Sequence, residues 1–165
     1  MNKEKVRELL TERVKSNMKK IFFENIANDI SNSNFDSSFL ILAEIRERIC
    51  NLVPNRKDIF KELNENIDVD FYRKIHSNGA FNINIIHGII NYVISKLKEF
   101  DCLENEPLYD NWKKDIQNKI ENKEDLDKLI PSFFKETMEH LDRIESHIMA
   151  FKKSDIYKFL SEKKQ

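Results

Sequence analysis

The sequence predicts an all-α protein, a single-domain bundle of about six to eight helices around one central apolar helix. Two observations support this fold class. The chain has only 2 glycines and 3 prolines among many Glu, Lys, Leu and Ile residues, which favour helices. Apolar residues recur at spacings of three and four, which is the helical period. With 165 residues the chain can bury a core without disulfides or metals, so residues 1–165 are interpreted as one domain.

The central helix is predicted at residues 83–100. Gly79 stops the preceding helix, because glycine readily adopts the positive φ of a helix C-terminus. Asn82 then caps the next helix by accepting hydrogen bonds from its free N–H groups. This helix is too apolar for a surface element, and we expect it to be buried. Its apolar residues are Ile83, Ile85, Ile86, Ile89, Ile90, Val93, Ile94 and Leu97.

The first helix is predicted at residues 3–30, with Asn2 as its cap. A polar stretch at residues 31–34 ends it. Its apolar residues are spaced by three and four and are interpreted as one inward stripe. They are Val6, Leu9, Leu10, Val14, Met18, Ile21, Phe22 and Ile26.

Three more helices are predicted before the central one. Asp36 or Ser37 caps the first of them, and Pro54 ends it because the residue before proline avoids the α region. A short helix follows at residues 56–64, and Asp68 caps the next. In the last of these helices Phe71, Tyr72 and Ile75 are predicted to point inward. The apolar residues of the first two are Phe39, Leu40, Leu42, Ala43, Ile45, Ile49, Leu52, Val53, Ile59, Phe60 and Leu63.

After the central helix, Pro107 opens a helix whose lone tryptophan, Trp112, is predicted to anchor the edge of the core. Asp125 begins the last long helix, in which Pro131 predicts a kink or a restart. Ser154 caps a terminal helical turn. That terminal turn carries Ile156, Phe159 and Leu160. The inward residues of the two preceding helices are predicted to be Leu108, Ile116, Ile120, Leu126, Leu129, Ile130, Phe133, Phe134, Met138, Leu141, Ile144, Ile148 and Phe151.

The charge balance excludes several function classes. Lys and Arg number 28 and Asp and Glu 29, so the net charge of -1 predicts no binding to nucleic acid. No apolar run approaches the roughly 18 residues of a membrane span. Two distant cysteines and no secretory leader predict a cytoplasmic protein. The excess of Asn, Lys and Ile suggests an AT-rich genome, such as that of a large DNA virus or a protist, so host cytoplasm or virion is the expected location if the source is viral.

No metal site is expected from the four histidines, His76, His87, His140 and His147. None has a Glu three residues earlier, as di-iron bundles require. Cys50 has no nearby Cys or His partner for zinc, nor has Cys102.

The sequence also predicts no catalytic residue and no cofactor. Two glycines cannot form a phosphate-binding loop. The charged residues around Glu139 and Arg143 are interpreted as a solvated face with pairs four residues apart. The basic cluster at Arg46, Arg48, Arg56 and Lys57 is interleaved with acids and is interpreted in the same way.

Several motifs occur in an order that resembles the T-complex protein 11 family. The chain looks like the front portion of typical, longer members. It departs from the family at Ser77 and Asn78, where members have an acidic residue and a histidine, and at Asn82, where they have Asp. The segment 101–107 keeps only a cysteine and a displaced proline of another family motif. The matching segments are residues 22–23, 40–45, 51–54, 67–71, 78–82, 92–94 and 129–134.

Members of that family are all-helical and are linked to cAMP-dependent protein kinase signalling as modulators, not as enzymes. The resemblance therefore implies a non-enzymatic protein-interaction module with a partner in a kinase pathway. We expect the partner to bind the outer helix faces and the loops at residues 31–36 and 101–106. The branched aliphatic residues of the central helix also fit a helix that docks in the groove of a kinase regulatory subunit, but burial is favoured because exposing them is costly.

Two alternatives from other classes stay open. One is a structural or virion-associated protein of a large DNA virus. The other is an enzyme whose site converges from distant side chains, with Asp68, Asp70, His76 and His87 as candidates. The sequence leaves the oligomeric state and the partner undetermined.

Overall fold

A computed structural model describes residues 2–163. Within them the chain forms eight α-helices, one 3-10 turn and no strand, so the all-α prediction is confirmed. The elements are α1 (Lys3–Ser31), α2 (Asp36–Leu52), α3 (Lys57–Asn66), α4 (Val69–Ser77), α5 (Ile83–Phe100), η1 (Leu103–Asn105), α6 (Glu106–Glu121), α7 (Leu126–Lys152) and α8 (Asp155–Lys163).

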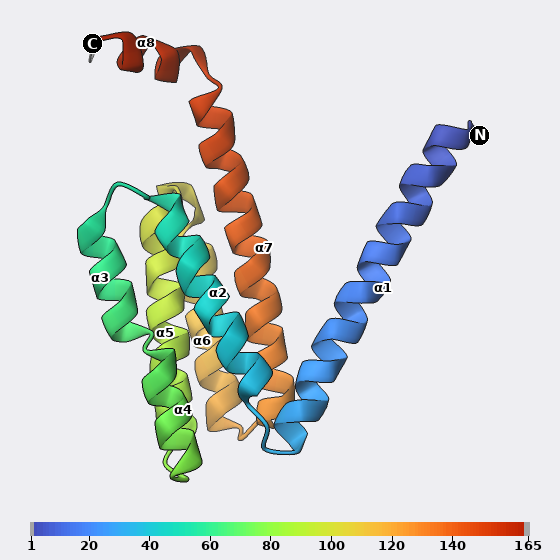
Figure 1. The fold of residues 1–165 in the computed structure, drawn as a ribbon, viewed down its shortest axis with the longest axis vertical. Coiled ribbons are helices and arrows are strands. Elements are labelled where there is room, and N and C mark those ends of the chain that lie inside the picture. Colours follow the sequence, from blue (N-terminus) through green and yellow to red (C-terminus); the bar gives the residue numbers. More distant parts are fainter. Residues whose placement is uncertain (1, 164–165) are drawn as a thin grey trace.

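Helices α2 to α7 form a bundle, which we call the body (Figure 1). The helix α1 meets the body only at its base, against the lower end of α7 in this view and the start of α2, and its other end lies away from the body, while α8 turns away at the opposite end of α7. No helix within residues 2–163 is long and apolar enough to cross a membrane.

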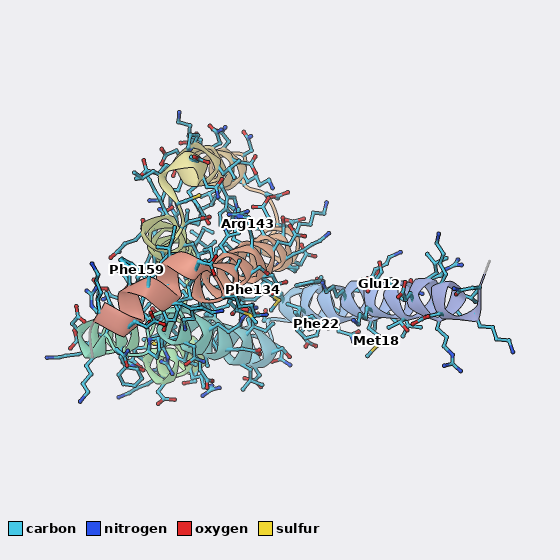
Figure 2. The ribbon with its side chains drawn as sticks, turned by 90° about the horizontal axis from the view of Figure 1, so that it is seen from above. Glu12, Met18, Phe22, Phe134, Arg143 and Phe159 are labelled. Carbon is cyan, nitrogen blue, oxygen red and sulfur yellow. The ribbon has the colours of Figure 1, made fainter. Side chains whose placement is uncertain are left out.

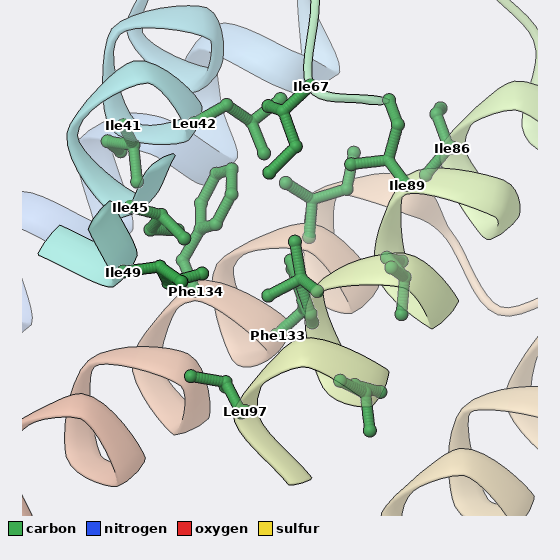
Figure 3. Packing of buried hydrophobic residues seen from close by; sticks show 14 of the residues in the cluster. Ile41, Leu42, Ile45, Ile49, Ile67, Ile86, Ile89, Leu97, Phe133 and Phe134 are labelled. Atoms are coloured by element: carbon green, nitrogen blue, oxygen red, sulfur yellow. The ribbon is translucent and has the colours of Figure 1, made fainter. Parts of the chain in front are cut away.

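The helix α5 lies in the core, as predicted. It packs on α2, α6 and α7, and Figure 3 shows its residues Ile86, Ile89 and Leu97 beside residues of α2 and α7. The stripe that would dock in a kinase groove is therefore used inside the body. Its buried members are Ile86, Ile89, Ile90, Val93, Ile94 and Leu97.

The predicted starts of α4 and α5 rest on the expected caps, whereas the cap expected for α2 is wrong, because Asp36 is its first helical residue and Phe35 precedes it without a capping side chain. The side chain of Asp68 accepts a hydrogen bond from the first turn of α4, and that of Asn82 accepts two from the first turn of α5. Gly79 has φ +73°, the left-handed conformation expected after α4. The restart expected in α7 is wrong, because the helix runs continuously through Pro131. Trp112 is buried and stacks on Phe133 of α7, as predicted.

The inward stripe predicted for α1 is wrong for most of its length. The helix begins at Lys3 with Asn2 as its cap, as expected, but only Ile26 and Ile30 are buried. The other members are 40–65% exposed: Val6, Leu9, Leu10, Val14, Met18, Ile21 and Phe22.

Residues 3–22 are exposed on every side because this part of α1 lies away from the body, and the spacing of the apolar residues also keeps them off any single side. An α-helix has 3.6 residues per turn, so a step of four residues advances about 40° beyond a full turn. A row that starts at Val6 and continues every four residues therefore winds around the helix. By Ile26 and Ile30 it has moved to another side, and only that side meets α7 and the start of α2.

Several inward predictions outside α1 are also wrong. Short helices such as α4 bury one narrow face, so a neighbour of a buried residue points outward. The helix α8 packs on α7 alone and buries none of its apolar residues. The residues predicted to be inward that are exposed are Phe71, Leu108 and Phe151, and the other apolar residues Leu40, Phe60, Ile156, Phe159 and Leu160 are exposed as well.

Candidate functional site

The residues considered for a convergent enzyme site have separate structural roles. Asp68 caps α4, and Asp70 forms an exposed ion pair on the same helix. The ring of His76 packs edge-on against Phe35, with 5.1 Å between the ring centroids. His87 is half-buried on α5. These positions favour structural roles for all four candidates.

Metal-binding groups are also dispersed. Within residues 2–163 no group of three His, Cys, Asp or Glu side chains could hold a metal ion. Both cysteines are free thiols, and burial raises the pKa of Cys50. A raised pKa keeps that thiol protonated and poorly nucleophilic.

A buried polar cluster joins the turn after α5 to α6 and α7. We call it the Asp101 cluster, made of Asp101, Tyr109, His140 and Arg143. The Asp101 side chain is 1% exposed and accepts hydrogen bonds from Tyr109 Oη at 2.5 Å and Arg143 Nη2 at 2.6 Å. The same Arg143 nitrogen lies 2.8 Å from Nδ1 of His140. The cluster therefore ties three segments together, and the predicted pairing of Arg143 with Glu139 is replaced by pairing with Asp101.

The electrostatics of the Asp101 cluster suit a structural role. Burial raises the pKa of Asp101, but hydrogen bonds from Tyr109 and Arg143 outweigh it and hold that pKa well below its ordinary range. Burial, and then the charge of Arg143, lower the pKa of His140. Burial and Asp101 raise the pKa of Tyr109. At neutral pH the carboxylate and the guanidinium are thus charged, and the histidine and tyrosine are neutral.

The basic cluster on α2 and α3 is engaged within the protein. Arg46 donates to the carbonyl oxygen of Ile67 at 2.7 Å, and Arg48 donates to carboxylates of α7. Arg56 pairs with Asp58. These contacts support the interpretation of the cluster as part of the protein's own surface network.

A small hollow in the core lies between α2, α5 and α7. Its volume is about 30 Å³, and its lining is apolar apart from Ser38. This is room for a water molecule. It is too small to hold a metabolite.

The longest run of exposed helical positions among residues 2–163 is on α1. Residues 3–22, which we call the arm, form twenty consecutive helical positions that are all exposed. Figure 2 shows the arm extending away from the body, with Met18 and Phe22 on one side and Glu12 on the other. Seven large apolar side chains on the arm are at least 40% exposed. A monomer rarely leaves so long a contiguous apolar surface without a use for it.

A groove continues from the arm to α7. It is lined by Phe23 and Ala27 of α1 and by Pro131 of α7, which form an apolar floor. Its charged lining residues are mostly basic: Lys19, Lys20, Lys128 and Lys135, with Glu24 and Asp127. The arm and this groove together form an apolar surface with basic margins.

The two loops expected to bind a partner differ from that expectation. In residues 31–36, Phe35 is buried and packs among the aromatic residues of the core. In residues 101–106, Asp101 belongs to the buried cluster, while Leu103 is 79% exposed. Each loop thus contributes one buried side chain to the fold.

The comparisons with known proteins agree with the family resemblance. The sequence model for T-complex protein 11 matches residues 2–152. The chain belongs to this family. A comparison with curated proteins found no match, and neither did a comparison with solved structures.

In this T-complex protein 11 family member, Asn82 caps α5 as the family's Asp would, so that departure preserves the fold. The arm is a candidate binding surface that the sequence reasoning missed, because its apolar spacing resembles that of a core helix. Two signals in the sequence could have identified the arm. The apolar residues that follow one another every four positions move around the helix, and Lys and Arg are in excess around them.

Proposed function

We propose that this protein is a non-enzymatic helical interaction module and that the arm is its binding surface. The observation that carries this proposal is the run of exposed helical positions at residues 3–22 with seven large apolar side chains. The body supplies a rigid base, since its own apolar helix α5 is fully used in the core.

The energetics favour a bound state for the arm. Complete burial of one large apolar side chain stabilises a complex by about 1.5–3 kcal/mol relative to full exposure. Several such side chains on one accessible helix are sufficient to offset the cost of association. Recognition of a helix by an apolar groove is a common mode of this kind.

Family membership supports a more specific proposal. We place the partner in the cAMP-dependent protein kinase pathway and the interaction in the cytoplasm, because members of the family are linked to that pathway as modulators.

The test is a quantitative pull-down from lysate of the source or its host, with the full chain as bait. The matched variant carries Leu10→Asp and Met18→Asp on the arm, and the control carries Ile156→Asp and Phe159→Asp on the equally exposed α8. We expect a stoichiometric partner that the arm variant loses and the α8 variant keeps. A kinase regulatory or catalytic subunit among the recovered proteins supports the specific proposal.

Two outcomes count against the proposal. A partner retained by the arm variant shows that another surface binds. Recovery of only particle proteins, or of only this chain itself, favours the structural or virion-associated alternative. Circular dichroism of each variant shows whether the helical fold is intact.

A further inference from the structure

The distribution of charge around the arm indicates what kind of partner fits it. The arm carries seven basic and three acidic residues, a net charge of +4, whereas the whole chain carries -1. We infer that the arm inserts into an acidic, apolar groove of another protein, with the chemistry that Ca²⁺-loaded EF-hand sensors present. This inference rests on the proposed function of the arm and names the class of its partner.

The first argument is the width of the apolar surface. At 100° per residue, the seven apolar side chains cover about 220° of the helix circumference, from Leu9 through Leu10 and Val14 to Phe22. One flanking helix or a flat bilayer reaches less than half of a helix surface. All positions from 3 to 22 are exposed, so a partner can reach the arm from around its circumference. The surface therefore fits a groove that encloses the helix.

The second argument is the position of the charges. On the same helical projection, the charged residues inside the apolar sector, Lys3, Arg7, Arg13 and Lys20, are all basic. The three acids, Glu4, Glu8 and Glu12, follow one another at a spacing of four and lie at its edge or on the opposite side. A groove with an acidic rim complements this arrangement.

The same positions argue against a second arm as the occupant. Pairing two arms through their apolar sectors would place basic residues against basic residues, and like charges across an interface oppose association. The lysines of the groove between α1 and α7 extend the positive margin to the base of the arm. An acidic partner would thus meet favourable charge at residues 13–22, which carry four basic residues and no acid, and at the base of the arm.

EF-hand sensors have both required properties. Their Ca²⁺ loops are built from Asp and Glu residues. Ca²⁺ opens in them a methionine-rich apolar groove that accepts basic amphipathic helices. The arm, about 30 Å long, offers twenty residues to such a groove. Binding of this kind depends on Ca²⁺, which makes the inference directly testable.

The experiment is isothermal titration calorimetry of the full chain with calmodulin as the probe, in Ca²⁺ and in EGTA. We expect stoichiometric binding in Ca²⁺ and none in EGTA. Leu10→Asp with Met18→Asp should weaken binding about 100-fold or more, since truncation of anchor residues commonly has effects of this size. Arg13→Glu with Lys20→Glu should weaken it about 10-fold, and this effect should shrink at high salt.

The α8 variant, Ile156→Asp with Phe159→Asp, is the matched control and should bind as the unmodified chain does. Absence of binding in Ca²⁺, binding that persists in EGTA, or binding retained by the arm variant would each overturn the inference. So would arm-dependent sedimentation with phosphatidylserine vesicles, or arm-dependent self-association, in the absence of calmodulin binding. An arm-dependent partner of another class in the pull-down would refute this inference and leave the proposed function standing.

Discussion

The arm and α5 are both helices rich in large aliphatic residues, yet their surroundings are opposite. On α5, Leu97 and Ile94 are fully buried. On the arm, the comparable residue Leu10 is 57% exposed. The content of large aliphatic residues therefore does not by itself separate a core helix from an exposed one. The charged residues between them differ, since the arm has ten in twenty positions and α5 has three in eighteen.

The polar contacts of the two regions also differ in burial. The body is tied by Arg143 to Asp101, whose side chain is 1% exposed. On the arm, the pair of Glu12 and Lys15 has both side chains at least 67% exposed, and such pairs contribute little. The difference teaches that the body is fixed by long-range contacts, whereas the arm is held only by its base.

The largest effect that would sharpen this comparison is a leucine truncation in each region. Leu97→Ala should lower the free energy of unfolding by about 3 kcal/mol because it leaves a cavity in the core. Leu10→Ala should change it by no more than about 0.5 kcal/mol. Urea unfolding followed by circular dichroism measures both. A comparable loss at Leu10 would break the comparison, because it would mean that the arm is packed.

The next largest effect concerns the Asp101 cluster. Arg143→Met should cost about 2 kcal/mol, less than the 3–5 typical for breaking a buried pair, because Asp101 keeps three other donors. The matched control is Arg48→Met, whose carboxylate partners are at least 40% exposed. This control should cost less than about 1 kcal/mol. Equal losses of unfolding free energy in the two variants, measured by chemical unfolding, would show that burial of Asp101 does not determine the contribution of its ion pair.

A smaller effect is expected at the two glycines. Gly79→Ala should destabilise by about 1 kcal/mol, because alanine is strained at positive φ. Gly88→Ala should stabilise by about 0.5–1 kcal/mol, because it lies in α5 with no atom within 4 Å of an added Cβ. Thermal unfolding of both variants measures the difference. The same sign for both would contradict the assigned conformations.

The smallest effect is a dependence on pH through His140. Its pKa in the folded state lies below the ordinary 6.5, so the stability that it contributes is complete above pH 6.5 and falls as the pH drops below it. Protonation of Asp101 adds a further loss below its ordinary pKa of 3.8. The urea concentration at half unfolding, measured between pH 7.5 and pH 5, gives the loss of stability through His140. His140→Gln should flatten this dependence of stability on pH. An unchanged dependence would mean that other groups cause it.

Much of the body could be predicted from the sequence because its signals are local. Gly79 and Asn82 set helix ends through the conformation and hydrogen bonds of adjacent backbone. The run of isoleucines in α5 is stable only in a core. The Asp101 cluster could not be predicted, because Arg143 lies 42 positions from Asp101 and three acids lie within four positions of Arg143 in the sequence. The arm was missed because a three-and-four spacing indicates a helix without showing whether a neighbour covers it.

The attachment of α1 to α7 has a consequence for synthesis of the chain. Ser31 at the end of α1 bonds to Asp127, 96 positions later. At a synthesis rate of 5–20 residues per second, the base of α1 waits about 5–20 s for its docking site to leave the ribosome. Throughout this interval both its core residues and its arm are uncovered. The N-terminal helix is thus the segment of the nascent chain that most needs a chaperone, and α7 closes the fold from the other end.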